Sequence, residues 1–395
     1  MRAAPVVTGL FVAAALGLFV AAMSDSSGNE PQAASKPDTA AATTSEAPEE
    51  AFEDAREPGH RSDRRRLSLR TTLGGAISPK SVAASGTGLV FAQNMMYRHS
   101  VTVYDAKRVA LKATIPDTVR LNRLGWPEYR GTQRGAPVEA AFSPDGKYGY
   151  VTNYSMYGSD FGPEGSDVCT PSSGYDRSFT YRIRLDTLKI DQAYRVGAVP
   201  KVVATTPDGK YVLVSNWCTY DLSVISTAKG KEVRRIPIGA YPRGVTVSKD
   251  SKKAYVAVMG GSEVISIDLT TWRTKALPIG SGPRALSLHP SGRYLFATLN
   301  AAGRVARLDL RTGRVVSVAT GTLPRSMDIA PDGRSLYVVN YEGGTVSKVR
   351  TVDMRVLETD EACYHPIGIT YEPVTSRVWV ACYGGSILVY DDKRA

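Results

Sequence analysis

The sequence lacks the short motifs that mark the common classes of catalytic site. It has no phosphate-binding G-x-x-x-x-G-K-[ST] loop, no G-x-S-x-G nucleophile elbow, no H-E-x-x-H zinc motif and no C-x-x-C pair. Histidine, which serves most often as a metal ligand or general base, occurs only four times in 395 residues. The P-loop, α/β-hydrolase and zincin classes are therefore excluded, and no catalytic residue, resident metal or cofactor is predicted.

Positive charge, by contrast, is in excess and is unevenly distributed along the chain. The net charge is +11. Residues 1–65 contain 6 Lys/Arg and 10 Asp/Glu, so the rest of the chain carries a net charge of +15. Because net charge governs association rather than fold, the basic body predicts anionic partners or an anionic surface.

The N-terminal segment is typical of an export signal. Residues 3–23 run for 21 positions without a charge, which is long for a signal-peptide core and just long enough to span a bilayer. The sequence "VAA" at 20–22 offers a cleavage site, and there is no lipobox cysteine. For residues 1–23 both a cleaved signal and an uncleaved membrane anchor remain open. Either one predicts a body outside the cytoplasmic membrane, secreted or anchored at the cell surface.

Residues 24–65 have the composition of a linker. They are rich in Ala, Ser, Pro and Glu and contain almost no large apolar side chains. Such a segment cannot bury enough surface to offset its chain entropy, so a disordered tether is predicted ahead of a folded domain at 66–395.

From residue 66 onward the chain repeats one pattern. An alternating apolar run follows a proline, then come a tight turn such as "TPDGK", a strand such as "YVLVSN" and two more β-type segments. Successive prolines are separated by 58, 63, 42, 41, 41 and 42 residues. These prolines are Pro79, Pro137, Pro200, Pro242, Pro283, Pro324 and Pro366. A period near 40 residues built only of strands predicts a β-propeller with one four-stranded blade per repeat.

The repeat also resembles a known family. The residues "YVTN" at 150–153, preceded by "SPDGK" at 143–147, are similar to the YVTN-repeat, or YncE-like, seven-bladed propellers. The resemblance covers roughly residues 66–395 and implies the fold, whereas propellers of this kind host binding, scaffolding and catalytic roles.

Seven prolines predict an all-β, seven-bladed propeller of four-stranded antiparallel blades, but the last blade is incomplete. The chain ends after "SILVYDDKRA", without a fourth strand. The missing strand is found at the front, where "SLRTTLGGAISPK" from Ser68 aligns with "EVRRIPIGAYPR" from Glu232. We therefore expect the segment near 67–73 to complete blade seven and close the ring.

The residue after each proline is usually basic. In a propeller the first strand of each blade lines the central channel, so these positions should meet at its mouth, with side chains at least partly solvated. Five of the seven are basic, and Val138 and Ile367 are the exceptions. The basic positions are Lys80, Lys201, Arg243, Arg284 and Arg325. They either satisfy strand ends and nearby acids such as Glu139, or form a ring of positive potential that attracts carboxylates or phosphates.

Aromatic residues and long loops should gather on the same face of the ring. The candidate ligand-binding residues from the loops after the second strands are Tyr154, Trp217, Tyr341 and Tyr383, with His365 from the link into blade seven. Their rings could stack on bases or sugars, or could be ordinary family packing. Two long insertions, 117–135 and 157–178, should rise there too, and long loops on a rigid scaffold commonly carry function.

The sequence favours an exported binding or scaffolding module whose ligand is an anionic cell-envelope polymer, a nucleic acid or an acidic partner protein. We expect a monomer that contacts the membrane only through its N-terminal segment, if that is uncleaved. One alternative is a lactonase-like propeller hydrolase with an acid/base pair such as Glu139 and His365, and another is a purely structural envelope protein. A metal site could be assembled from further residues, although their spacing fits no known ligand pattern. Those residues are Met95, Met96, His99, Glu361 and His365.

The four cysteines predict two disulfides, because an even number in an exported chain normally pairs. Cys363 precedes the proline of blade seven, and Cys382 ends the second strand of that blade on the same face. Cys169 and Cys218 lie in equivalent loops of two neighbouring blades. The repeat register therefore predicts Cys169–Cys218 and Cys363–Cys382.

Overall fold

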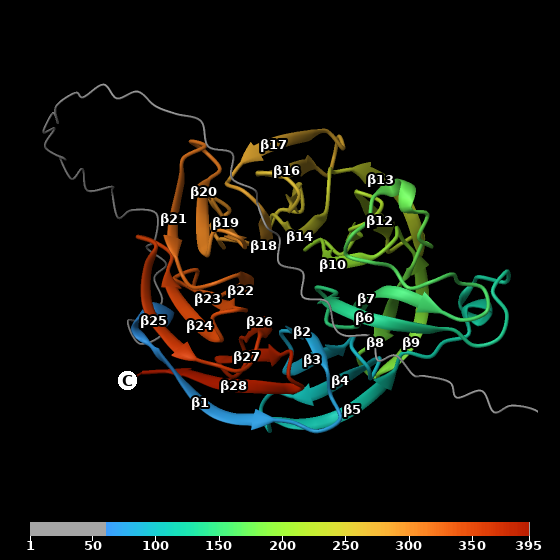
Figure 1. Ribbon diagram of the computed structural model, residues 1–395, viewed down its shortest axis with the longest axis horizontal. Helices are drawn as coiled ribbons and strands as arrows, with labels where there is room; N and C mark the ends of the chain where they lie inside the picture. The colour runs from blue at the N-terminus through green and yellow to red at the C-terminus, as the bar shows by residue number, and fades with distance from the viewer. Residues whose placement is uncertain (1–60, 395) are drawn as a thin grey trace, which may run out of the picture. The chain divides into compact units, whose positions relative to one another are not determined.

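The computed structural model describes residues 61–394, which form seven β-sheets. The sheets are arranged as a ring around a central axis (Figure 1). Three short 3₁₀ helices, η2 (Ser62–Arg64), η3 (Leu121–Leu124) and η4 (Pro171–Ser173), accompany the strands. The predicted export signal at 1–23 and residues 24–60 of the predicted linker lie outside the described residues. Within the described part of the chain, no helix is long and apolar enough to cross a membrane.

Each sheet contains four antiparallel strands, and sequence order follows spatial order in six of the seven. The innermost strands are β2 (Pro79–Ala84), β6 (Arg134–Phe142), β10 (Pro200–Thr205), β14 (Pro242–Val247), β18 (Pro283–Leu288), β22 (Pro324–Ile329) and β26 (Pro366–Glu372). The second strands are β3 (Leu89–Asn94), β7 (Tyr148–Tyr157), β11 (Tyr211–Asn216), β15 (Lys253–Val258), β19 (Tyr294–Leu299), β23 (Ser335–Asn340) and β27 (Arg377–Cys382). The third strands are β4 (Ser100–Asp105), β8 (Phe179–Arg184), β12 (Asp221–Ser226), β16 (Glu263–Asp268), β20 (Arg304–Asp309), β24 (Thr345–Arg350) and β28 (Ser386–Lys393). The outermost strands are β5 (Ala110–Pro116), β9 (Lys189–Arg195), β13 (Lys231–Pro237), β17 (Thr274–Pro278), β21 (Val315–Ala319), β25 (Arg355–Glu361) and β1 (Arg66–Leu73).

The repeat sequence explains this order. The turn after each innermost strand is tight, and in "TPDGK" and "APDGR" its glycine has a left-handed backbone, with φ of 71° at Gly209 and 72° at Gly333. Second strands such as β19 and β23 are buried throughout, whereas outer strands such as β21 alternate between exposed and half-buried residues. The hydrophobic core therefore lies between adjacent blades. Each innermost strand contacts the next around the axis, including β26 with β2.

The ring closes as the sequence predicts. β1 pairs antiparallel with β28, from Arg66 opposite Lys393 to Leu73 opposite Ile387. The predicted N-terminal strand of blade seven is therefore confirmed, and with it the seven-bladed fold.

Buried polar contacts reinforce the closing blade. The Lys348 ammonium on β24 donates to Asp392 Oδ1 on β28 at 2.6 Å and to the Arg65 carbonyl at 2.8 Å. Asp392 also accepts a hydrogen bond of 2.6 Å from the Tyr337 hydroxyl. Just before β1, Ser62 donates from both its backbone N–H and its hydroxyl to Asp332 at 2.7 Å. Blade six is thus tied to both ends of the described chain.

Candidate functional site

The five basic side chains that follow the prolines converge on the axis of the ring. Each proline pairs with a residue at the same level of its neighbouring second strand, as Pro200 does with Asn216 and Pro137 with Asn153. The residue after each proline is therefore at the same height in the channel. The convergence is seen at Lys80, whose pKa is lowered well below its ordinary value by burial and then by the charges of its four basic counterparts. Those counterparts are Arg243, Arg284, Lys201 and Arg325.

The expectation that these side chains are solvated is wrong for three of them. Lys201 is only 2% exposed, Arg284 6% and Arg243 7%. The two exceptions to the basic pattern, Val138 and Ile367, are buried at the same level. These three basic groups therefore lie inside the ring, not at a rim open to water.

A cavity of about 660 Å³ extends from these side chains along the channel. Arg243, Arg284 and Arg325 line its inner end. Its other end is lined by turns that connect first to second strands, including the exposed residues Thr87 and Pro144. The cavity thus reaches solvent on the face opposite the prolines, which we call the turn face.

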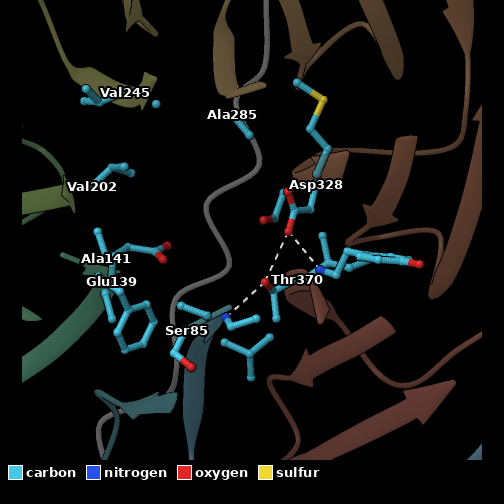
Figure 2. Close-up of a pocket in the computed structure, with 18 of the residues that line it drawn as sticks. Ser85, Glu139, Ala141, Val202, Val245, Ala285, Asp328 and Thr370 are labelled. Carbon is cyan, nitrogen blue, oxygen red and sulfur yellow. Dashed lines mark hydrogen bonds between the residues drawn. The ribbon is translucent and has the colours of Figure 1, made fainter. Parts of the chain in front are cut away.

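Two carboxyl groups enter the cavity from opposite walls, Glu139 on β6 and Asp328 on β22 (Figure 2). Burial raises the pKa of Glu139, although Arg243, Ser81 and Lys80 oppose the rise. Burial also raises the pKa of Asp328. The Asp328 carboxylate is satisfied locally, because it accepts from the backbone N–H of Tyr371 at 2.8 Å. Arg243 and Arg284 act on the pKa of Glu139 through their charge and not through a hydrogen bond.

Three of the predicted aromatic residues make cation–π contacts with basic side chains of the ring. The Lys201 ammonium lies 4.3 Å from the ring centre of Tyr154 and 5.2 Å from that of Trp217. The Arg325 guanidinium lies 3.6 Å from the ring centre of Tyr341. All three aromatic residues are at least 92% buried. Their faces contact and stabilise two of the protein's own cations, Lys201 and Arg325.

A second aromatic group surrounds His365. Its imidazole stacks between Tyr341 at 4.1 Å and Tyr364 at 3.8 Å, and lies edge-on to Tyr383 at 6.3 Å. Its Nε2 is 3.3 Å from a carboxylate oxygen of Glu342. Tyr383 is 37% exposed, so this group reaches the outer surface.

Neither the acid/base pair nor the metal site considered from the sequence is formed by the described residues. His365 has Glu342 as its ion-pair partner, and no contact joins it to Glu139. His99 stacks on Tyr157 and lies 3.7 Å from Asp117. No group of three or more His, Cys, Asp or Glu in residues 61–394 could hold a metal ion.

The long loop between β7 and β8 covers the basic ring from the proline face. Asp167 Oδ1 accepts hydrogen bonds from the Lys201 ammonium at 2.6 Å and from the Tyr154 hydroxyl at 3.2 Å. The Asp167 carbonyl accepts from Trp217 Nε1 at 3.0 Å. Despite the cost of desolvation, the Lys201 ammonium holds the pKa of Asp167 below its usual value.

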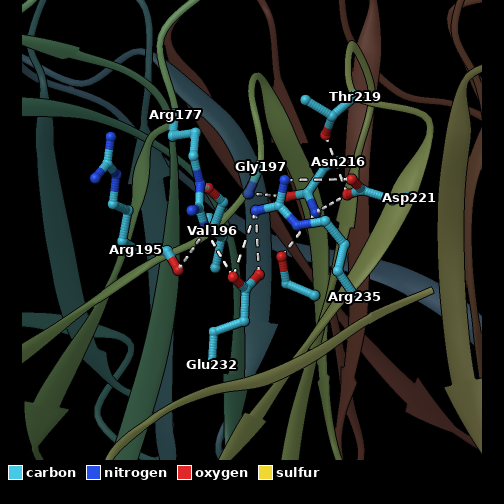
Figure 3. A network of polar contacts seen from close by, with 10 residues as sticks. Arg177, Arg195, Val196, Gly197, Asn216, Thr219, Asp221, Glu232 and Arg235 are labelled. Atoms are coloured by element: carbon cyan, nitrogen blue, oxygen red, sulfur yellow. Dashed lines mark hydrogen bonds and ion pairs between the residues drawn. The ribbon is translucent and has the colours of Figure 1, made fainter. Parts of the chain in front are cut away.

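Both ends of this loop are fixed. Cys169 forms a disulfide with Cys218, as predicted, and Cys363 pairs with Cys382. At the far end, Arg177 donates to the Val196 carbonyl at 2.8 Å and to Glu232 at 2.6 Å (Figure 3). Glu232 also accepts from Arg235, so a network across blades two and three anchors the loop.

Asp167 and Asp328 were not singled out by the sequence pattern. Asp328 has no distinguishing signal, because it is one of many acids near turns. Asp167 does have one: it lies two residues before Cys169, whose predicted disulfide brings the loop beside Trp217. The disulfide register could therefore have located this carboxylate near the basic ring.

Comparison with known proteins supports the architecture. No protein-family model matches the chain, and no curated protein matches it. Among solved structures, hydrazine synthase of Kuenenia stuttgartiensis aligns with a TM-score of 0.64 and 17% identity, covering 82% of this chain and 98% of that one. At this identity the likeness shows the propeller fold alone.

Proposed function

We propose that this protein is an extracytoplasmic binding module that holds an anionic ligand in its axial channel. The observation that carries the proposal is the excess of buried positive charge. Five basic side chains converge on the axis, and Arg243, Arg284 and Arg325 line the inner end of the cavity. Of the five, only Lys201 has a carboxylate within ion-pair distance in the described residues.

Such an arrangement is costly without a counter-ion. Burying an unpaired charge costs several kcal/mol, so an anion that neutralises the ring gains a correspondingly favourable interaction. Low-dielectric walls strengthen that interaction, and arginine provides fork-shaped donors that match carboxylate and phosphate oxygens. The ligand could present such groups from any of the predicted classes: a cell-envelope polymer, a nucleic acid or an acidic protein.

The cysteines support the location. Both disulfides are formed and none of the described cysteines is free, which is typical of proteins from an oxidising compartment. This agrees with the export predicted from residues 1–23 and favours a place outside the cytoplasmic membrane.

The test is binding of a panel of anions at low salt: heparin, single-stranded DNA, polyglutamate, citrate and inorganic phosphate. Replacing Arg243, Arg284 and Arg325 together by Gln should weaken binding at least tenfold, because a hydrogen bond to a charged group contributes about 1.5–3 kcal/mol. Arg314→Gln, at an exposed arginine before β21, is the matched control and should bind as the unmodified protein does. If no anion binds, or the triple variant binds equally well, the proposal fails.

A further inference from the structure

The cavity has the size of a small-molecule site. Its volume of about 660 Å³ falls within the range of roughly 300–1,000 Å³ that is usual for ligand pockets. A ligand inside it must be compact, or must be the compact end of a larger molecule.

Access differs between the two faces of the ring. On the proline face, Asp167 lies against Lys201, and the disulfide between Cys169 and Cys218 holds its loop in place. The charge of Asp167 also opposes the lowering of the pKa of Arg284 and Arg325, so this carboxylate acts on basic groups of several blades. On the turn face, the cavity ends among exposed residues such as Gly86 and Pro144. Entry is therefore from the turn face.

The inner end of the cavity presents donors that lack partners. Within the described residues, the side chains of Arg243 and Arg284 make no hydrogen bond or ion pair, although each is more than nine-tenths buried. The buried Nε atoms of Arg284 and Arg325 have no acceptor. Buried polar groups are almost always satisfied, so donors of this kind in a cavity wall indicate a missing acceptor.

Resting on the proposed anion-binding function, we infer that the inner end of this cavity binds a compact anion with two or three negative charges on carboxylate or phosphate oxygens, admitted from the turn face. The number of negative charges on the ligand follows from the charged groups that line the cavity. Three arginines line it together with the carboxyls of Glu139 and Asp328, and burial raises the pKa of both carboxyls. The excess of positive charge in the cavity is two when one of these carboxyls is protonated, and three when both are.

Asp167 shows that a carboxylate can pair with a basic side chain of the ring. Its carboxylate satisfies Lys201 from the proline face, so the protein itself supplies a carboxylate to one member of the ring. The arginines on the cavity side have no such group. Asp167 neutralises Lys201 from the proline face, and the ligand neutralises the arginines from the turn face.

The first experiment is calorimetric titration of the full chain with citrate and, separately, with inorganic phosphate. At least one should bind, and it should displace any polyanion held by the ring. The two titrations distinguish a carboxylate site from a phosphate site. Asp167→Asn, made in the Lys201→Met background so that the protonation of Lys201 does not change with it, should tighten binding several-fold, because it removes a negative charge close to the bound anion.

The second experiment tests the entrance. Ala285, half-buried on β18, faces the cavity one residue from Arg284 toward the turn face (Figure 2). Ala285→Phe should narrow the channel and reduce binding at least tenfold. Ala276→Phe, the same change at an exposed position on outer strand β17, should have no effect.

Each of the other possible results contradicts one specific part of the proposal. If a polyanion binds through the arginines but neither citrate nor phosphate does, the compact site is wrong and the proposed function stands. If citrate or phosphate binds equally to both Ala→Phe variants, entry from the turn face is wrong. Should Asp167→Asn weaken binding in that background, this carboxylate contacts the ligand favourably and the assignment of an anionic ligand is wrong. The Asp167 titration does not depend on whether Ala285→Phe folds.

Discussion

Lys201 is a member of the basic ring that changes its charge near neutral pH. Burial lowers its pKa from 10.5 to about 7, with Arg243 and Arg284 adding to this effect and Asp167 opposing it. Tyr154 and Trp217 are the other groups packed against the ammonium. The charge on Lys201, and with it the attraction for an anion, is therefore lost as the pH rises through about 7.

The expected result is that anion affinity falls between about pH 6 and pH 9, because a bound anion favours protonated Lys201. The stability of the ligand-free protein changes in the opposite direction with pH. Between about 7 and 10.5 the unfolded chain binds a proton that the folded chain does not, so stability rises with pH across this window. Lys201→Met should flatten both profiles, whereas Lys275→Met, at an exposed residue of β17, should leave them unchanged. Affinity that is constant over this pH range would contradict the assignment.

At the scale of the element, the loop over the proline face depends on its disulfide. The bond between Cys169 and Cys218 spans 49 residues and links blades two and three. Replacing both cysteines by Ser should lower the free energy of unfolding by about 2–4 kcal/mol, as measured by denaturant titration. Amide hydrogen exchange in residues 158–178 should also increase, because the loop then relies on non-covalent contacts of Asp167 and Arg177.

The matched control is the second disulfide. Cys363 and Cys382 are separated by 19 residues, so their replacement by Ser should cost less in loop entropy. It should leave exchange in residues 158–178 unaffected. Equal exchange in the two double variants would mean that the first disulfide does not fix the loop.

For the whole molecule, closure by β1 is the point at which the ring is most easily opened. Leu67 on this strand is buried in the cluster that includes Ile369 and Tyr390, which contributes about 1.5–3 kcal/mol. Deleting residues 66–74 also exposes the edge of β28. The melting temperature should fall by several degrees or more, whereas a deletion of equal length at 24–32 should leave it unchanged. Equal melting temperatures would show that β1 is not needed for closure.

The architecture could be predicted from the sequence, but the burial of the basic residues in the site could not. The period of the prolines determined the blades, the closing strand and the disulfide pairs, because these depend only on register along the repeat. Register also put Lys201 and Arg243 at one height in the channel. It could not predict their burial, since this depends on a carboxylate from a non-repeating loop, Asp167, and on packing against Trp217. The opening of the cavity on the turn face was missed for the same reason.

The closing strand also determines when the molecule can finish folding. Arg70 and Asp391, which form a hydrogen bond across the closure, are 321 residues apart. During synthesis β1 emerges before its partner β28, so this edge has no native neighbour until almost the entire chain is available. Blades one to six can form in order, but completion of the circle must be a late, non-local step, and such steps are slow. A chain truncated near its C-terminus would then expose two open edges and be prone to aggregate.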